Sequence, residues 1–204
     1  VLILGLSACS NVYYQAMESV GVHKREIMVD RVEEARDSQK EAKEEFLTAL
    51  EQFKSVVDFQ GGILEKEYNR LNDTLQRVED EADEVHERIA AVEDVSKALF
   101  KEWRAEIDQY NSETLRSSSR RKYDAAQSRY AGLMQAMKRA ESRLEPALIP
   151  LRDQVLFLKH NLNARAIAGL SSEVVTVQTN VDNLVRDMEL AIAQADAFIA
   201  SLEE

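Results

Sequence analysis

The sequence predicts an all-α protein, an elongated up-down antiparallel bundle of four long, coiled-coil-like helices. Three observations predict this fold. The 204 residues include only 6 Gly and 2 Pro, so the chain makes few turns and consists of a few long elements. Its composition is rich in Ala, Glu, Leu, Lys and Arg, which favour helices. Apolar residues recur at alternating spacings of three and four in four segments, as in helices wound along one another.

The first helix is predicted from a heptad stripe that runs toward a pair of glycines. A start near Val12 would match the second helix in length, with a kink at Gly21. Two adjacent glycines are costly inside a helix and suit its C-terminal cap, so we expect the helix to end at residues 60–62. The stripe consists of Met28, Val32, Ala35, Gln39, Ala42, Phe46, Ala49, Phe53 and Val56.

The second and third helices are predicted near residues 63–109 and 118–168. Asn111, Ser112 and the serine run at 117–119 are expected to form the turn between them. The second helix carries Leu64, Tyr68, Leu71, Leu75, Val78, Ala82, Val85, Ile89 and Val92. The third carries Tyr123, Ala126, Tyr130, Leu133, Met137, Ala140 and Leu144, and then, one step shifted, Leu148, Leu151, Val155, Leu158 and Leu162.

Two prolines lie where the stripe of the third helix shifts. Because proline inside a helix costs about 3 kcal/mol, Pro146 and Pro150 predict either a kink or a break with Pro146 in the first turn of a new helix. Gly169 and the serines at 171 and 172 are expected to separate this helix from the fourth. The fourth carries Val174, Val177, Val181, Leu184, Met188, Ala191, Ala195, Phe198 and Leu202.

Helix lengths then predict the shape of the molecule. At 1.5 Å per residue the second and third helices each span about 70 Å, whereas the fourth spans about 50 Å. An up-down path places the N-terminus, the 110–119 turn and the C-terminus at one end, and the turns at 60–62 and 169–172 at the other. The short fourth helix is expected to leave a three-helix section beside the 110–119 turn.

The lone cysteine predicts a location in the cell. The sequence LSAC at residues 6–9 follows an apolar run and resembles the bacterial lipobox, in which a thiolate accepts diacylglycerol. Residues 1–8 are then a signal-peptide remnant, 9–22 a lipidated linker or helix extension, and 23–204 a single elongated helical-bundle domain. Ser10 resembles the outer-membrane sorting pattern, so we expect a periplasmic protein anchored to the outer membrane through Cys9. The alternative is an incidental free cysteine after a short apolar N-terminus.

Two longer segments carry a family resemblance. ESVGVHKREIMVDRVEEARDSQKEAKEEFLTALEQFKSV, at residues 18–56, and DQVLFLKHNLNARAI, at residues 153–167, resemble a family of bacterial lipoproteins catalogued as domain of unknown function 2959. The resemblance extends over nearly the whole chain from Val20 onward. It implies an all-helical secreted protein and brings no known activity, so it supplies no catalytic residues.

The sequence offers no pattern typical of an enzyme, and we predict no catalytic residue, no cofactor and no metal site. The histidines at 23, 86 and 160 are scattered, and metal-binding or nucleophile motifs do not occur. The acidic segment EDEADEVHE at 79–87 places Glu79, Asp83 and His86 or Glu87 on one helix face. That face is either a divalent-cation ligand set or, as we favour, a solvated surface. Gln39 is the one polar residue on the first stripe, where such residues specify register.

The charge of the chain and the predicted positions of its polar residues indicate which partners and contact surfaces to expect. A net charge of −11 disfavours nucleic acid as a partner. We therefore expect a non-catalytic structural or adaptor protein of the cell envelope that docks an unknown protein partner. An alternative is a membrane-contacting or membrane-shaping bundle, and a third class is an enzyme with a site hidden between helices.

The membrane-contact candidates, on the predicted turn, are Arg116, Arg120, Arg121 and Lys122. The docking candidates, at the opposite tip, are Gln60, His160, Asn161 and Asn163.

Overall fold

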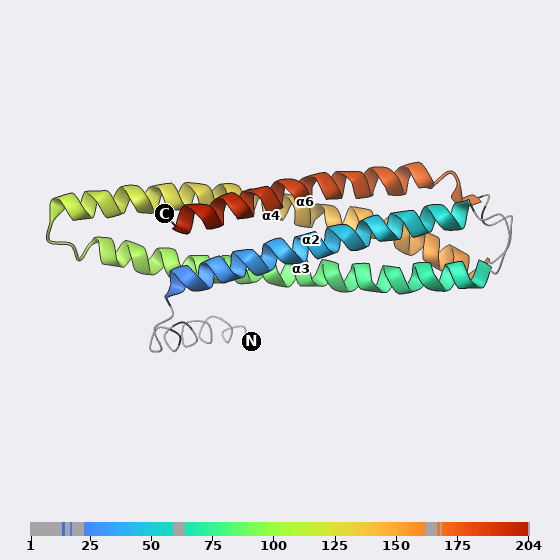
Figure 1. Ribbon diagram of the computed structural model, residues 1–204, viewed down its shortest axis with the longest axis horizontal. Coiled ribbons are helices and arrows are strands. Elements are labelled where there is room, and N and C mark those ends of the chain that lie inside the picture. Colours follow the sequence, from blue (N-terminus) through green and yellow to red (C-terminus); the bar gives the residue numbers. More distant parts are fainter. Residues whose placement is uncertain are drawn as a thin grey trace, which may run out of the picture.

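The computed structural model describes residues 23–58, 64–161 and 169–203, together with Tyr14, Met17 and Ile167. Four long helices occupy these residues and no strand occurs among them, which confirms the predicted all-α bundle. They are α2 (Lys24–Val57), α3 (Leu64–Ile107), α4 (Glu113–His160) and α6 (Val174–Glu203). The helices lie side by side along one long axis (Figure 1).

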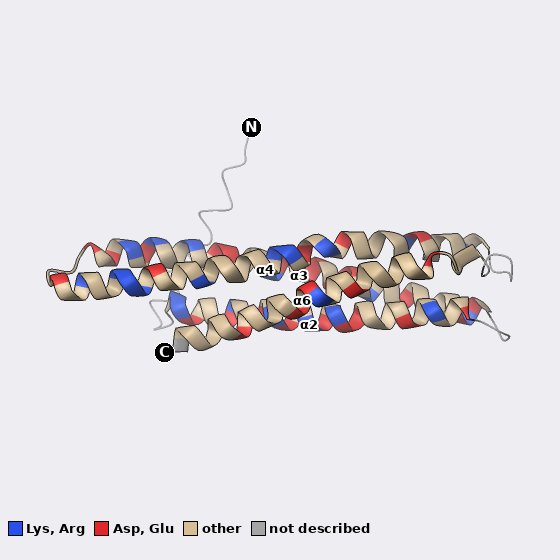
Figure 2. Ribbon diagram, turned by 90° about the horizontal axis from the view of Figure 1, so that it is seen from above, with Lys and Arg blue, Asp and Glu red and all other residues tan. Residues whose placement is uncertain are grey.

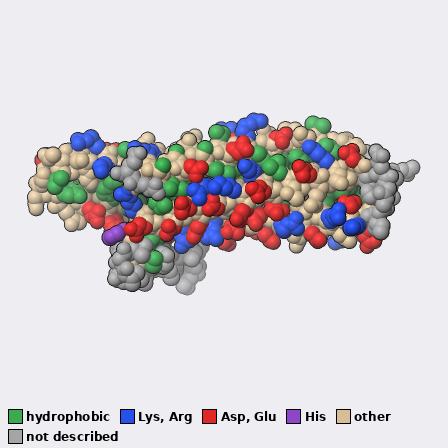
Figure 3. Space-filling model, viewed as in Figure 1, with side chains coloured by type: hydrophobic (Ala, Val, Ile, Leu, Met, Phe, Trp, Pro, Cys, Tyr) green, Lys and Arg blue, Asp and Glu red, His purple; other side chains and the backbone are tan. Residues whose placement is uncertain are grey.

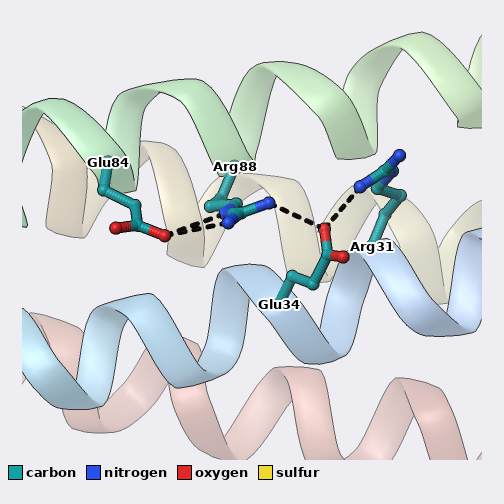
Figure 4. A network of polar contacts seen from close by, with 4 residues as sticks. All are labelled: Arg31, Glu34, Glu84 and Arg88. Carbon is teal, nitrogen blue, oxygen red and sulfur yellow. Dashed lines mark hydrogen bonds and ion pairs between the residues drawn. The ribbon is translucent and has the colours of Figure 1, made fainter.

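Each helix packs on two others, so the four form a ring in the order α2, α3, α4, α6. Ion pairs show that neighbours run antiparallel. Arg36 pairs with Asp196 at 3.1 Å and Lys43 with Glu189 at 3.7 Å, so ascending residues of α2 meet descending residues of α6. A second set crosses from α2 to α3: Glu34 accepts from Arg31 at 2.6 Å and from Arg88 at 3.0 Å, and Arg88 also pairs with Glu84 (Figure 4).

The predicted stripes form the core of the bundle. All nine stripe residues of α2 are buried, Gln39 included, because their spacing returns each one to the face that meets α3 and α6. The stripes of the other helices are buried as well, apart from Leu64, Tyr68, Tyr130 and Val174, which are half-buried. Leu162 lies outside the described residues.

The α3–α4 hairpin projects beyond the other two helices. In Figures 1 and 2 its tip extends past the C-terminal end of α6 and the start of α2. The ion pair between Lys24 and Glu102, at 3.0 Å, marks where α2 begins beside α3. Among the described residues this section contains two helices, so the expected three-helix section is wrong. It has its own small core of Phe100, Ile107, Tyr123 and Ala126, with Trp103 and Tyr130 packed against it.

The first helix starts later in the sequence than predicted. α2 begins at Lys24, with His23 as its N-cap, and the backbone N–H of His23 donates to the Glu26 carboxylate at 3.2 Å. Tyr14 does not lie farther along the same axis. Its hydroxyl donates to Asp94 of α3 at 2.8 Å, and Asp94 precedes Glu102 in the direction away from the hairpin tip. The helix of the described residues thus starts at Lys24 rather than near Val12, and residues 18–22 lie outside the described residues.

The third helix starts earlier and ends earlier than predicted. Ser112 caps α4, its side chain accepting from the N–H of Leu115 at 3.4 Å, so the serines at 117–119 are helical and the turn is confined to residues 108–112. α4 ends at His160 rather than near 168. It continues through Pro146 and Pro150 without a break. Pro146 is exposed, so water can reach the carbonyl of Ser142 that lacks a helical donor.

Charged side chains cover the outside of the bundle. On the face in Figure 3 acidic and basic groups are interspersed along the rod. Figure 2 shows Lys and Arg gathered along the projecting part of α3 and α4. The projecting hairpin is thus locally more basic than a chain with a net charge of −11.

Candidate functional site

Two of the four docking candidates predicted for the distal tip, His160 and Asn161, lie among the described residues. Asn161 is the C-cap of α4, and its Nδ2 donates to the carbonyl of Phe157 at 3.0 Å. This hydrogen bond satisfies one of the carbonyls at the helix end. His160 is exposed at the end of the same helix. Gln60 and Asn163 lie outside the described residues.

An exposed apolar stripe on α4 lies next to His160. Ile149 is 49%, Leu156 59% and Phe157 43% exposed. Residues seven and eight positions apart share one side of a helix, and His160 continues that side by three or four positions. We call Ile149, Leu156, Phe157 and His160 the α4 stripe. Heptad counting missed it because that search follows the buried face, and only the run LFL at 156–158 hints at apolar residues left over.

The membrane-contact candidates occupy the first turns of α4 and not a turn between helices. Arg116 pairs with Glu113 at 3.0 Å and donates to the carbonyl of Tyr110 at 2.6 Å. Nη2 of Arg120 lies 3.9 Å from Oδ1 of Asp108. In the described part of the chain, Arg121 and Lys122 form no ion pair. The cluster therefore presents two uncompensated cations rather than four.

Two large apolar side chains accompany these cations at the hairpin tip. Tyr110, in the turn, is 38% exposed, and Leu115, in the first turn of α4, is 56% exposed. A projecting tip with exposed apolar groups and nearby cations is a typical surface for contact with an anionic bilayer. The sequence hinted at the charges but not at the apolar pair.

The acidic segment at 79–87 forms ion pairs between and within helices. Glu79 accepts from Arg152 of α4, and Nδ1 of His86 lies 2.6 Å from Oε1 of Glu141, also on α4. Glu84 pairs with Arg88 in its own helix. The segment is thus divided among partners, and within residues 23–58, 64–161 and 169–203 no group of three or more ligand-type side chains could hold a metal ion.

Glu81 is the member of this segment whose environment is least favourable. Its Oε2 is buried with no hydrogen-bond partner. Burial, followed by the charges of Glu41, Glu84, Glu45 and Asp80, raises the pKa of its carboxyl. Because the pKa is raised in the folded state, this carboxyl favours folding below its unfolded pKa and loses that contribution as pH rises through the folded value.

Two polar side chains of α2 are buried inside the bundle. Gln39 is fully buried and Ser38 nearly so. Neither the amide oxygen and nitrogen of Gln39 nor the hydroxyl of Ser38 has a hydrogen-bond partner. A buried amide without partners loses its water without replacement, at a cost of about 1–3 kcal/mol. The position of Gln39 was expected, but its lack of partners was not.

A buried carboxylate connects α6 to α4. Asp187 is 3% exposed, and its oxygens meet Nε of Arg139 at 2.9 Å and Nε of Arg143 at 3.1 Å. The two arginines are four residues apart and therefore share one side of α4. Nothing in the spacing of Asp187 marks it, because it stands beside the stripe residue Met188. The arrangement stabilises one register of α6 on α4.

A cavity of about 560 Å³ opens at the step where α2 begins and α6 ends. All four helices contribute to it. Its lining consists of His23, Lys24, Arg25, Leu99, Glu102, Trp103, Glu106, Lys122, Ala125, Ala126, Arg129, Ser201 and Leu202. Of the membrane-contact and docking candidates predicted from the sequence, Lys122 is the one that lines this cavity.

Cys9 lies outside the described residues, so the structure does not test the lipid anchor. No helix among the described residues combines the length and the apolar character that crossing a bilayer requires.

Comparison with known proteins gives a family and no activity. Among curated proteins, no sequence matches this chain. A family model described as protein of unknown function, DUF2959, matches residues 13–202. The matched range includes all four helices, the cavity and the α4 stripe. Because the match spans most of its length, the chain belongs to the DUF2959 family of proteins of unknown function.

Proposed function

We propose that this chain is a lipid-anchored structural or adaptor protein of the bacterial cell envelope, held on the periplasmic side of the outer membrane by Cys9 and without catalytic activity of its own. The observation that carries the adaptor role is the α4 stripe. It exposes three large apolar side chains near one end of a rigid rod. Large apolar side chains exposed on one side of a helix are typical of protein contacts.

The rest of the bundle supports this role. The core stripes are filled along all four helices, and crossed ion pairs hold their register. A rigid rod keeps a docking surface at a fixed distance from its anchor. The partner we propose is an envelope protein that presents an apolar helix face, since the spacing of Ile149 and Leu156 is that of one heptad.

Site-specific crosslinking tests the docking surface. A photoreactive residue in place of Leu156, in the full chain in cells, should give one discrete adduct with an envelope protein. The matched control is the same residue at Leu190, an equally exposed leucine on α6. Adding Leu156→Glu to a probe at Phe157 should remove the adduct while the melting temperature stays the same, because both sites are exposed. Equal adducts at both positions, or none at Leu156, would contradict the proposal.

A second candidate function is direct contact with the membrane through the hairpin tip. The specific observation in its favour is the pairing of exposed Tyr110 and Leu115 with the uncompensated charges of Arg121 and Lys122. Each basic group near an anionic surface contributes about 1 kcal/mol, and screening over about 8 Å weakens it at physiological salt.

Vesicle binding distinguishes this candidate. Unlipidated protein should bind anionic phosphatidylglycerol vesicles at low salt and release them near physiological salt. Arg121→Ser with Lys122→Ser should abolish the binding without loss of helicity. The control removes two exposed cations from the opposite end of α3, Lys66→Ser with Arg70→Ser, and should bind like the parent. Equal binding by both double variants, or none by the parent at low salt, removes the membrane-contact role.

A further inference from the structure

Part of the lining of the cavity at the step in the bundle is apolar, and we call this part its floor. Leu99 and Trp103 of α3, Leu202 of α6, and Ala125 and Ala126 of α4 line it. The small alanines leave space that a larger side chain would fill. The Trp103 indole is held in place, since its Nε1 donates to Ser119 at 3.0 Å and its ring meets Tyr123 edge-on at 5.7 Å. The floor is therefore preformed, as in small-molecule sites of similar volume.

The rim of the cavity is positively charged. Four basic and two acidic side chains line it, a net charge of +2 with His23 neutral. Lys24 is held by Glu102, at 3.0 Å. In the described part of the chain Arg25, Lys122 and Arg129 form no ion pair, and Glu106 is the one remaining carboxylate of the lining that opposes their three charges. These three cations come from two helices and converge on one opening.

The start of α2 adds to this positive potential. The cavity meets the first residues of a 34-residue helix, where the backbone dipole favours an anion and the Glu26 carboxylate already accepts from the N–H of His23. The protein as a whole has a net charge of −11, so its general field would repel an anion. A local excess of cations over an apolar floor therefore has no explanation in solubility alone.

We propose that this cavity binds an amphiphilic anion, a molecule with a phosphate or carboxylate head and a single alkyl chain. The head would lie among Arg25, Lys122 and Arg129, since guanidinium groups bind such oxyanions through paired hydrogen bonds. The first carbons of the chain would lie against Trp103 and Leu99, in the space left by Ala125. This role is separate from the docking surface and from the lipid on Cys9.

Trp103 provides the measurement, because it is the only tryptophan in the chain. Dodecyl phosphate and dodecanoate, each added below the concentration at which it forms micelles, should change Trp103 fluorescence in a saturable way. Inorganic phosphate and the neutral dodecyl maltoside should bind at least about 10-fold more weakly, because each lacks one half of the recognition. Saturable binding of either anion supports the proposal. Failure of both anions, or equal binding by phosphate alone or by the maltoside, overturns it.

Variants locate the site. Lys122→Ala with Arg129→Ala should weaken binding of dodecyl phosphate by about 10-fold or more, since charge-assisted hydrogen bonds are lost. Arg121→Ala, which removes a neighbouring cation outside the cavity, should bind like the parent. Ala125→Leu should fill the floor and abolish binding, with circular dichroism and melting temperature confirming an intact fold. Parent-like binding by Ala125→Leu, or equal losses in the Arg121 and the double variant, would place the ligand elsewhere and overturn the proposal.

Discussion

A chain in which serine replaces Cys9 should be lost from the membrane fraction. The thiol sulfur is the atom that accepts diacylglycerol in a lipobox, and a hydroxyl is a far weaker nucleophile at neutral pH. The helices that the structure describes include none able to span a bilayer. Under the proposed anchoring through Cys9, loss of the lipid should have an almost complete effect.

The measurement is fractionation of cells that make the full chain, followed by intact-mass determination. Membranes are washed at high ionic strength, which screens contacts made by Arg121 and Lys122. The variant should appear in the soluble fraction or stay uncleaved, and it should lack the mass of the acyl groups. Ser10→Ala is the control for an adjacent change and should keep the lipid. A variant with the same partition and mass as the parent would disprove the anchor.

Replacing Gln39 with leucine should raise the free energy of unfolding by about 1–3 kcal/mol. The amide is fully buried, and neither of its polar atoms has a partner. Leucine has a similar size and no polar atoms, so the substitution removes the desolvation cost and keeps the packing. For a chain of this length such a gain raises the melting temperature by roughly 2–4 °C per kcal/mol.

Thermal and denaturant unfolding measure this gain. Gln127→Leu makes the same chemical change at an exposed position of α4 and should leave stability within about 0.5 kcal/mol. Sedimentation of the Gln39 variant is informative too, because a buried polar residue can specify register at a cost in stability, and leucine there can admit other oligomers. Lower stability of Gln39→Leu would mean that the amide has a partner in solution.

The buried face of each helix was predictable because it depends on local spacing. Phe46 lies at a heptad position, and this spacing alone places it on the face of α2 that packs against the neighbouring helices. The predicted up-down order and the turn near residue 110 follow from the same spacing and from the positions of the breaks. None of these inferences required knowledge of a contact between distant residues.

Helix ends and sites were less predictable because they depend on such contacts. The serines at 117–119 were assigned to a turn, but Ser117 donates to the carbonyl of Thr114 at 3.1 Å, and Ser119 accepts from Trp103. These partners let serine continue a helix that its propensity disfavours. The cavity depends on where α2 starts relative to α3, which no single segment encodes. Its residues Arg25, Trp103 and Arg129 were therefore missed.

The contact between Tyr14 and Asp94 determines how the rod would be held at a membrane. Tyr14 follows Cys9 by five positions, a reach of at most about 17 Å. Asp94 lies about 20 Å along α3 from Ile107 and about 45 Å from Leu64. An acyl chain on Cys9 would thus attach the rod to the membrane through its side, about a third of the length of α3 from the end near the hairpin tip. If the rod rotates about this attachment point, its two ends lie at unequal distances from it. The cavity and the hairpin tip are on the shorter side, and the α4 stripe is on the longer side and therefore moves through the larger distance.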